Sequence, residues 1–383
     1  MEAVATRERH MKRAFVWGPA ILTLAVAASC AALSGRPADG LADSLRINQI
    51  QAVGTHNSYK LAIAPEMMKL IADRSADTAL TLDYSHRSLA EQLDAGARQV
   101  ELDPVYDPDG AFGDPLGARM LAQQGVDVPV SDRAVMAKPG IKVLHVADID
   151  YRSSCLTLID CLTQVKAWSD KHRDHTPILI MINPKHTPLS WPGATPVKPF
   201  GRQALDQMDA DILFVFARER IVTPDEVRGS HATLREGATS GGWPTLADAR
   251  GRVMFVIDDA PQRWGPYADG HPSLKGRVAF VNAHNAPDAP EAAIFVSNEP
   301  IADFSLMQQR VAAGFIVRTR ADADTREART GDTTRREKAF ASGAQYVTTD
   351  YIWPDPRFGT GFTVKLPGDA AARCNPVSAP AGC

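Results

Sequence analysis

The chain has 383 residues, which is enough to bury a large hydrophobic core as one large α/β domain or two smaller ones. Its apolar, charged and aromatic fractions of 44%, 23% and 7% are those of ordinary globular proteins, so a largely disordered chain is not expected. A formal net charge of −3 provides no overall basic field, and nucleic acid is therefore not expected as a partner.

The first 31 residues have the pattern of an export signal. Four basic residues between Arg7 and Arg13 precede an uncharged run over residues 15–28, and small residues follow. We predict a signal peptide over residues 1–31, a linker over residues 32–45 and a secreted or periplasmic protein. Small residues also precede Cys30, which leaves lipid attachment at Cys30 as a second interpretation, whereas the uncharged run is short for a membrane span.

Short apolar runs beyond residue 45 predict a parallel sheet. Most are continuous rather than alternating, as in strands covered on both faces, and helix-like segments separate them. Strand and helix alternate about eight times, which favours a (β/α)8 barrel over an open doubly wound sheet, and no Gly-x-Gly-x-x-Gly turn indicates a dinucleotide fold. The expected strands are 50–53, 98–102, 141–144, 178–182, 253–257, 278–281 or 294–296, 315–318 and 346–349, and the expected helices include 89–95, 158–171, 205–216 and 303–313.

Two long segments look irregular: residues 106–140, rich in Asp, Pro and Gly, and residues 184–199, with five prolines. Loops of this length on the active-site face of a barrel often shape a substrate groove. We place the catalytic barrel domain at residues 46–360 and a C-terminal tail at residues 361–383. The chain from Pro354 onward is rich in Pro, Ala and Gly, and we expect it to pack loosely.

Four cysteines lie beyond the predicted signal, and they form two local pairs, Cys155 with Cys161 and Cys374 with Cys383. An even number of cysteines at short spacing in an exported chain predicts two disulfides. A zinc site is the competing interpretation, but neither pair has the short two-to-four-residue gap that is usual for zinc ligands.

Two histidines follow predicted strands. His56 ends the first run and His145 ends the third, and the C-terminal ends of barrel strands meet at one face, so we expect both imidazoles in one pocket. An imidazole can take and give a proton near neutral pH. His56 as base and His145 as acid, on either side of a bound phosphate, would cleave a phosphodiester. For each histidine taken alone, a structural hydrogen-bonded role is the alternative.

Glu101 and Asp103 end the second run and would point to the same face of a regular strand. Two neighbouring carboxylates repel one another unless a cation lies between them, and oxygen ligands suit calcium or magnesium. Asn57 and Asn183 could add amide oxygens to the same ion. A salt-bridged acidic pair at the barrel rim is the alternative.

Three basic residues follow later strands and are candidates for binding a phosphate or polar headgroup. Lys185 comes after the fourth predicted strand, and Arg318 and Arg320 come at the end of the seventh. Each of them alone is more often a solvated or salt-bridged residue.

Several of these motifs together resemble the calcium-dependent, bacterial-type phosphoinositide phospholipases C. The resemblance covers residues 46–353 and rests on His56-Asn57, Glu101-x-Asp103 and His145, together with the segments 314–325 (GFIVRTRADADT) and 341–350 (ASGAQYVTTD). The early His-Asn and Glu-x-Asp pairs also resemble the catalytic core of the eukaryotic phosphoinositide phospholipases C.

The resemblance implies a distorted TIM barrel of the PLC-like phosphodiesterase type that uses general acid–base catalysis and one calcium ion. By analogy, His56 would assist attack of the inositol 2-hydroxyl on phosphorus, and His145 would protonate the departing diacylglycerol oxygen. Asn57, Glu101 and Asp103 would be calcium ligands. Where the eukaryotic relatives place a further glutamate ligand, this chain places Asn183, which leaves less negative charge around the ion.

Two other functions remain open from the sequence. A glycerophosphodiester phosphodiesterase or a sphingomyelinase D-like lipase shares the barrel, a Glu-x-Asp metal pair and a histidine couple, but the His-Arg-Gly and Glu-Asn-Thr segments of the former are absent. A non-catalytic barrel that binds a headgroup or glycan is the third reading. For an enzyme, we expect a phospholipid or glycerophosphodiester substrate, transient contact with a membrane surface and a monomeric protein.

Overall fold

The computed structural model describes residues 40–383. The predicted signal peptide and the predicted linker up to residue 39 lie outside the described residues. No helix in the part of the chain that the structure describes has both the length and the hydropathy of a membrane span.

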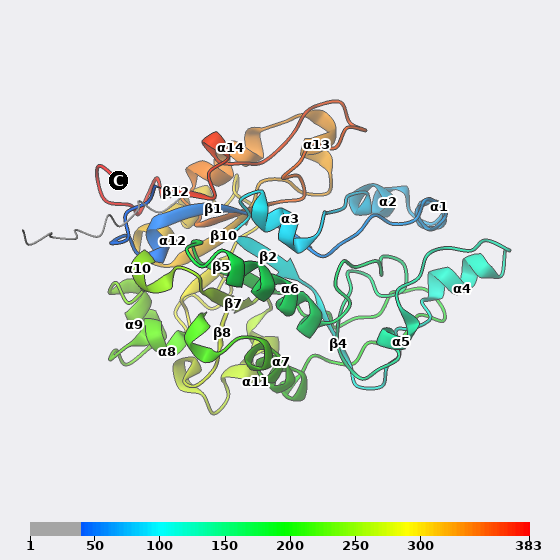
Figure 1. The fold of residues 1–383 in the computed structure, drawn as a ribbon, viewed down its shortest axis with the longest axis horizontal. Coiled ribbons are helices and arrows are strands. Elements are labelled where there is room, and N and C mark those ends of the chain that lie inside the picture. The colour runs from blue at the N-terminus through cyan, green and yellow to red at the C-terminus, as the bar shows by residue number, and fades with distance from the viewer. Residues whose placement is uncertain (1–39) are drawn as a thin grey trace, which may run out of the picture. The chain divides into compact units, whose positions relative to one another are not determined.

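Eight parallel strands form a distorted (β/α)8 barrel, as the sequence predicts (Figure 1). Around the barrel they follow the order β1, β2, β5, β7, β8, β9, β10, β11, and β11 pairs again with β1. The barrel is distorted where β8 meets β9, because an isolated bridge between Asn282 and Ile294 joins them. The strands are β1 (Ile50–Thr55), β2 (Gln99–Leu102), β5 (Ile178–Ile182), β7 (Val253–Ile257), β8 (Ala279–Val281), β9 (Ile294–Val296), β10 (Ile316–Arg320) and β11 (Tyr346–Thr349).

One predicted barrel strand is wrong. The run over residues 141–144 forms β4 (Gly140–Val143), which pairs antiparallel with β3 (Pro104–Asp107) in a separate two-stranded sheet. Conversely, 279–281 and 294–296, between which the sequence could not choose, are both barrel strands. β5 is therefore the third strand of the barrel, not the fourth.

The helices agree with the sequence pattern where it was strongest. Helices were predicted over 89–95, 158–171, 205–216 and 303–313, and each is present within three residues of its predicted bounds. The helices that follow or flank the barrel strands are α3 (Leu89–Asp94), α6 (Leu158–Lys171), α7 (Arg202–Val215), α8 (Pro224–Arg228), α9 (Leu234–Thr239), α10 (Leu246–Ala249), α11 (Pro261–Ala268), α12 (Phe304–Ala312), α13 (Arg326–Thr330) and α14 (Thr334–Ala341). Short 3-10 turns are η1 (Ile47–Gln49), η2 (Arg218–Arg220), η3 (Pro272–Leu274) and η4 (Pro367–Asp369), and β6 (Ile221–Val222) is a short strand beside β7.

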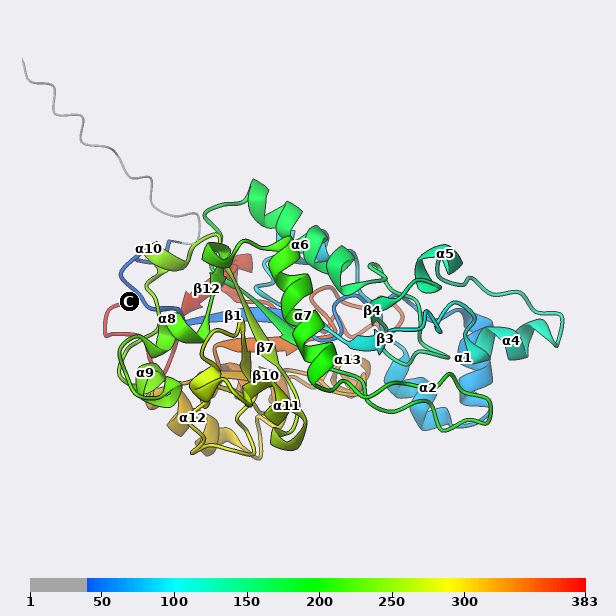
Figure 2. The same cartoon turned by 90° about the horizontal axis from the view of Figure 1, so that it is seen from below.

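A lobe with its own hydrophobic core lies beyond the C-terminal ends of β1 and β2 (Figures 1 and 2). We define the lobe as α1 (Pro65–Ala72), α2 (Ala76–Leu82), the β3–β4 hairpin, α4 (Leu116–Ala122), α5 (Arg133–Met136) and the loop over residues 184–199. Its core includes Met67, Leu70, Val105, Leu121 and Met136, all buried. The two segments predicted to be irregular thus contribute to one folded unit at the active-site end of the barrel.

The C-terminal chain packs tightly, contrary to expectation. β12 (Ala372–Cys374) pairs antiparallel with β1, and Phe362, Val364 and Leu366 are buried in the barrel core. Both predicted disulfides, Cys155–Cys161 and Cys374–Cys383, are present. The apolar residues of the tail explain the packing, since each removes surface from water.

Candidate active site

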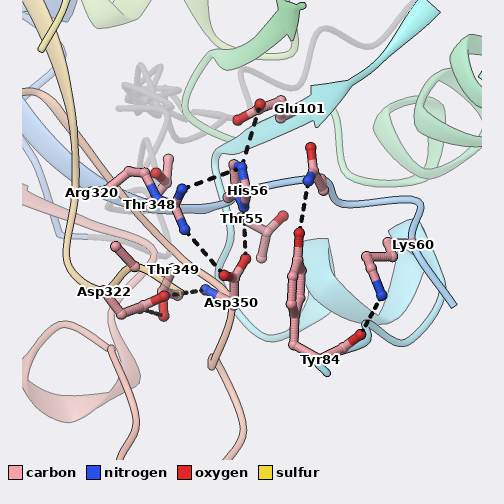
Figure 3. Close-up of polar contacts among 12 residues, drawn as sticks. Thr55, His56, Lys60, Tyr84, Glu101, Arg320, Asp322, Thr348, Thr349 and Asp350 are labelled. Atoms are coloured by element: carbon pink, nitrogen blue, oxygen red, sulfur yellow. Dashed lines mark hydrogen bonds and ion pairs between the residues drawn. The ribbon is translucent and has the colours of Figure 1, made fainter. Parts of the chain in front are cut away.

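His56 lies directly after β1, at the C-terminal end of the barrel. β1 can pass close to β2 because Gly54 faces Gln99; a Cβ atom there would come within 2.4 Å of the Gln99 side chain. The Nδ1 atom of His56 lies 2.9 Å from Asp350 Oδ1, and its Nε2 atom lies 3.4 Å from Arg320 Nη1 (Figure 3). A guanidinium only donates, so Nε2 is the acceptor and Nδ1 carries the proton that is donated to Asp350.

The surroundings keep His56 neutral. Burial and the positive charge of Arg320 lower the pKa of His56 to about 4, although Asp350 and Glu101 act in the opposite direction. Burial alone would raise the pKa of Asp350, but His56, His86 and Arg320 hold it well below its usual range. Near neutral pH the pair is therefore a neutral imidazole beside a carboxylate, with a lone pair on Nε2 that can take a proton.

Asp350 is held in place from behind by Asp322. The Asp350 N–H donates to Asp322 Oδ1 at 3.0 Å, and the Thr349 hydroxyl donates to Asp322 Oδ2. Burial and the charge of Asp350 raise the pKa of Asp322 to about 7. Figure 3 shows both carboxyl groups beside the end of β11, with Asp350 directed toward His56.

Glu101 is buried on β2 and faces several predicted site residues. Its Oε2 atom accepts a hydrogen bond from Arg318 Nη2 at 2.7 Å, and its Oε1 atom lies 3.9 Å from His56 Nε2. Asn183, at the end of β5, donates to the same Oε1 at 3.5 Å. The structure thus brings His56, Glu101, Asn183, Arg318 and Arg320 together, with Arg318 paired to Glu101.

Asn57 connects this group to a buried network. It has a positive φ of 47°, which Asn tolerates better than most residues, and its Nδ2 donates to Tyr84 Oη at 2.7 Å. Lys60, fully buried, donates to the backbone oxygen of Tyr84 at 2.7 Å and forms an ion pair with Asp150 at 3.3 Å. Asp150 in turn accepts from His145 Nδ1 at 2.7 Å.

His145 reaches the site by a different route from the predicted one. It follows β4 of the antiparallel hairpin, because the chain turns at Asp103 from β2 directly into β3 and β4 then returns beside it. The Leu144 N–H donates to the Asp103 backbone oxygen at 3.1 Å, which places His145 next to the end of β2. Within residues 40–383, Nε2 of His145 has no hydrogen-bond partner.

Asp103 and Lys185 form an ion pair, with Lys185 Nζ 2.6 Å from Asp103 Oδ2. Lys185 and His145 line the same cavity, of about 340 Å³. The predicted site residues therefore form two neighbouring groups: one around His56 and Glu101, and one around His145, Asp103 and Lys185.

The oxygen atoms in this region have the chemistry of a calcium site. Asn57 Oδ1 and Asp103 Oδ1 are buried and accept no hydrogen bond, and the second carboxylate, Glu101, is also buried. Oxygen atoms of carboxylates and amides are the ligands that calcium prefers, and a buried acceptor without a partner is unfavourable unless a ligand satisfies it. Among residues 40–383, no group of three or more His, Cys, Asp or Glu side chains is arranged to hold a metal ion.

The sequence reasoning missed the residues that orient the two histidines. Asp350 follows a predicted strand, and the rule that located His56 would have located it too. Asp150 lies in a loop, five residues after His145, and no local pattern marks it. Tyr84 and His86, whose Nε2 lies 2.7 Å from the His56 backbone oxygen, lie between α2 and α3 and were likewise not predictable.

Comparison with known proteins identifies the family. Residues 45–376 match the sequence profile of "Phosphoinositide phospholipase C, Ca2+-dependent". The fold resembles a calcium-dependent phosphoinositol-specific phospholipase C from a Pseudomonas species, with a TM-score of 0.54 and 18% identity over 86% of this chain and 96% of that one. It also resembles the calcium-dependent phosphatidylinositol-specific enzyme of Streptomyces antibioticus, with a TM-score of 0.50 and 18% identity over 82% of this chain and 98% of that one.

No curated protein sequence matches the chain. The match to the family profile covers most of the chain, and its metal is calcium, so the magnesium alternative gains no support. The chain therefore belongs to the Ca2+-dependent phosphoinositide phospholipase C family and is a phosphoric diester hydrolase.

Proposed function

We propose that the protein cleaves phosphatidylinositol-type lipids with His56 as general base and His145 as general acid, releasing diacylglycerol and an inositol phosphate. The observation that carries the proposal is the matched placement of the two imidazoles, each with Nδ1 against a carboxylate. A carboxylate in this position selects the tautomer and stabilises the imidazolium that forms when the other nitrogen takes a proton.

The first half of the reaction uses His56. Its Nε2 atom takes the proton of the inositol 2-hydroxyl while that oxygen forms a bond to the adjacent phosphorus, and Asp350 stabilises the resulting imidazolium. Arg320, 3.4 Å from Nε2, contributes positive charge beside the phosphate as negative charge develops on its oxygens.

The second half uses His145. As the bond from phosphorus to the glycerol oxygen breaks, His145 donates a proton to that oxygen, so diacylglycerol leaves as an alcohol and a cyclic inositol phosphodiester remains. Water can then open the ring with the two histidines in exchanged roles, which gives the inositol phosphate. Lys185 lies in the same cavity and is placed to bind the phosphate.

Asn57, Glu101, Asp103 and Asn183 would hold calcium. When bound, calcium supplies positive charge that offsets the charge developing on the phosphate. Lys185 and Arg318 form ion pairs with Asp103 and Glu101, the two carboxylates of this set.

The site and the predicted signal peptide together indicate an exported enzyme that makes transient contact with a membrane surface. The signal peptide over residues 1–31, with lipid attachment at Cys30 as the alternative, stays a prediction. Mass spectrometry of the mature protein distinguishes cleavage near residue 31 from a lipidated Cys30.

The test of the function is cleavage of phosphatidylinositol with and without calcium, followed by phosphorus NMR of the water-soluble products. We expect a cyclic 1,2-phosphate that appears only with calcium. Release of glycerol phosphate from glycerophosphodiesters, without any inositol phosphate from phosphatidylinositol, would contradict the proposal and indicate a glycerophosphodiester phosphodiesterase.

A further inference from the structure

A cavity of about 340 Å³ opens beside His145, and Asp350 is not among the residues that line it. It lies between the loop that follows β4 and the proline-rich loop over residues 184–199; the second loop belongs to the lobe, and the first packs against the lobe core through Val146 and Ala147. His145 and Lys185 are its ionisable groups with free hydrogen-bonding capacity toward the cavity, because the third, Asp148, is fully engaged elsewhere. The apolar lining comes from Val105, Val146, Ala147, Pro188, Leu189 and Val197.

Asp148 makes the cavity a preformed one. Its Oδ1 accepts from the Leu116 N–H at 2.8 Å and from Thr195 Oγ1 at 2.8 Å, and its Oδ2 accepts from the Thr195 N–H at 2.7 Å. One buried carboxylate thus ties the loop after β4, the beginning of α4 and the proline-rich loop together. The cavity walls do not depend on a ligand to bring them together, so binding a ligand costs little free energy for ordering them.

The apolar wall is an outer surface of the lobe core. Val105 is buried in that core, and Val146, Leu189 and Val197 pack against it while remaining partly exposed. A second cavity, of about 520 Å³, borders the site on the Asp350 side and has a different lining that includes Asp83, Arg87, Asp355 and Arg357. The cavity on the Asp350 side also has apolar walls, with Met68 and Trp353 among them, but it carries more charged side chains than the cavity beside His145, where Lys185 and the engaged Asp148 are the charged residues.

We propose that the cavity beside His145 binds the first carbons of the acylated glycerol leaving group, an inference that rests on the proposed function. The acid that protonates the leaving oxygen must lie next to it, so the carbon atoms attached to that oxygen extend into whatever space borders His145. Here that space is apolar. Its volume is at the low end of the range of about 300–1,000 Å³ for ligand pockets, so it holds the glycerol and the beginning of an acyl chain rather than two long chains.

The test compares two soluble substrates with the same inositol phosphate headgroup, namely monomeric dihexanoyl-phosphatidylinositol and glycerophosphoinositol. The variants are Val197→Asn and Leu189→Asn, which place an amide in the apolar wall. We expect each to lower kcat/KM for the dihexanoyl substrate by about tenfold, since losing apolar contacts in a pocket changes discrimination by this order. Turnover of glycerophosphoinositol should change by less than about twofold.

The matched control is Val130→Asn. Val130 also packs against the lobe core and is partly exposed, but it does not line the cavity. Equal effects of Val197→Asn and Val130→Asn on the two substrates would overturn the inference and leave the proposed function intact. If the wild-type protein released no inositol phosphate from either substrate, the proposed function would fail as well.

A binding measurement covers the case in which a variant is unstable. Dihexanoylglycerol, the product, should inhibit cleavage of glycerophosphoinositol by the wild-type protein, whereas glycerol at equal concentration should not. Absence of inhibition by dihexanoylglycerol would contradict binding of the acylated glycerol in this cavity.

Discussion

The two histidine–aspartate pairs look alike locally but are built in different ways. The side chains of His56 and His145 are 17% and 18% exposed, and their Nδ1 atoms lie 2.9 and 2.7 Å from Asp350 and Asp150. His56 and Asp350 come from neighbouring parallel strands of the barrel, β1 and β11, at opposite ends of the chain. His145 and Asp150 come from one short loop after an antiparallel hairpin.

Their neighbours also differ. Asp350 contacts Arg320 on one side and Asp322 on the other, and Arg320 donates to Nε2 of His56. Asp150 is paired instead with the buried Lys60, and within residues 40–383 Nε2 of His145 accepts no hydrogen bond from a cation. The barrel pair, His56 and Asp350, is therefore arranged to keep a neutral imidazole that accepts a proton. The hairpin pair, His145 and Asp150, leaves Nε2 of His145 open toward the cavity with the apolar lining.

The largest expected effects are those of His56→Ala and His145→Ala. Each should lower kcat on phosphatidylinositol by roughly a hundredfold or more, with little change in thermal stability. The two should separate on an inositol phosphate ester of 4-nitrophenol, whose leaving group needs no proton, so that only His56→Ala remains severely impaired. Retained activity together with a large fall in melting temperature would return both histidines to a structural role.

Replacing the aspartate of each pair by asparagine should affect the stability of the protein differently. Asp350→Asn should lower kcat by roughly a hundredfold, because an amide no longer selects the tautomer of His56. Asp150→Asn should lower kcat for the same reason, and in addition it should lower the free energy of unfolding by about 3 kcal/mol, since Lys60 is fully buried and loses its ion-pair partner. Urea unfolding measures this difference, and a larger stability loss for Asp350→Asn than for Asp150→Asn would contradict it.

Asp103→Asn should weaken calcium binding by roughly tenfold or more, because it removes a negative ligand next to the hairpin pair. Isothermal titration calorimetry with calcium measures the affinity directly. Asp109→Asn is the control with the same change of charge, since Asp109 is exposed in the lobe and pairs with Lys198. Equal calcium affinity of Asp103→Asn and the wild type would remove Asp103 from the metal site.

The hairpin pair should depend on a disulfide, whereas the barrel pair should not. Cys155–Cys161 closes the segment that follows Asp150, and Ser154 N donates to the Tyr59 backbone oxygen at 2.8 Å. Replacing both cysteines by Ser should reduce stability by about 2 kcal/mol and also lower kcat. The same replacement at Cys374 and Cys383 should reduce stability by a similar amount without an effect on kcat; a loss of activity there would contradict the comparison.

The smallest effect concerns the pH dependence of stability. The pKa of Asp322 is raised to about 7 in the folded protein, so the folded state binds this proton more strongly than the unfolded state. Its contribution to stability is present below about pH 4 and is lost as the pH rises through about 7. Asp322→Asn cannot ionise, so the melting temperature of the variant relative to that of the wild type should be higher at pH 8 than at pH 5. The same difference in melting temperature between variant and wild type at both pH values would contradict the prediction.

The sequence predicted the barrel strands well where burial on both faces leaves a continuous apolar run. Residues 178–182 and 253–257 are such runs, and both are fully buried neighbouring strands. Residues 141–144 form a similar short run, interrupted by Lys142, yet they form half of an antiparallel hairpin, because the direction of a strand depends on its partner and the partner is Pro104–Asp107. A single segment carries no information about that choice.

By itself, the sequence determined the fold class and the two disulfide pairs, and it singled out His56, Glu101 and Asp103 as candidate site residues, because these depend on residue type and short spacing. Only the tertiary structure decided which carboxylate orients each histidine, that Arg318 and Lys185 neutralise the acidic residues, and that His145 borders an apolar cavity. Apart from His145 and Asp150, which lie five residues apart, these contacts join segments distant in the chain, such as His56 and Asp350 with a sequence separation of 294. They exist only once the barrel has closed and the lobe has packed against its C-terminal end.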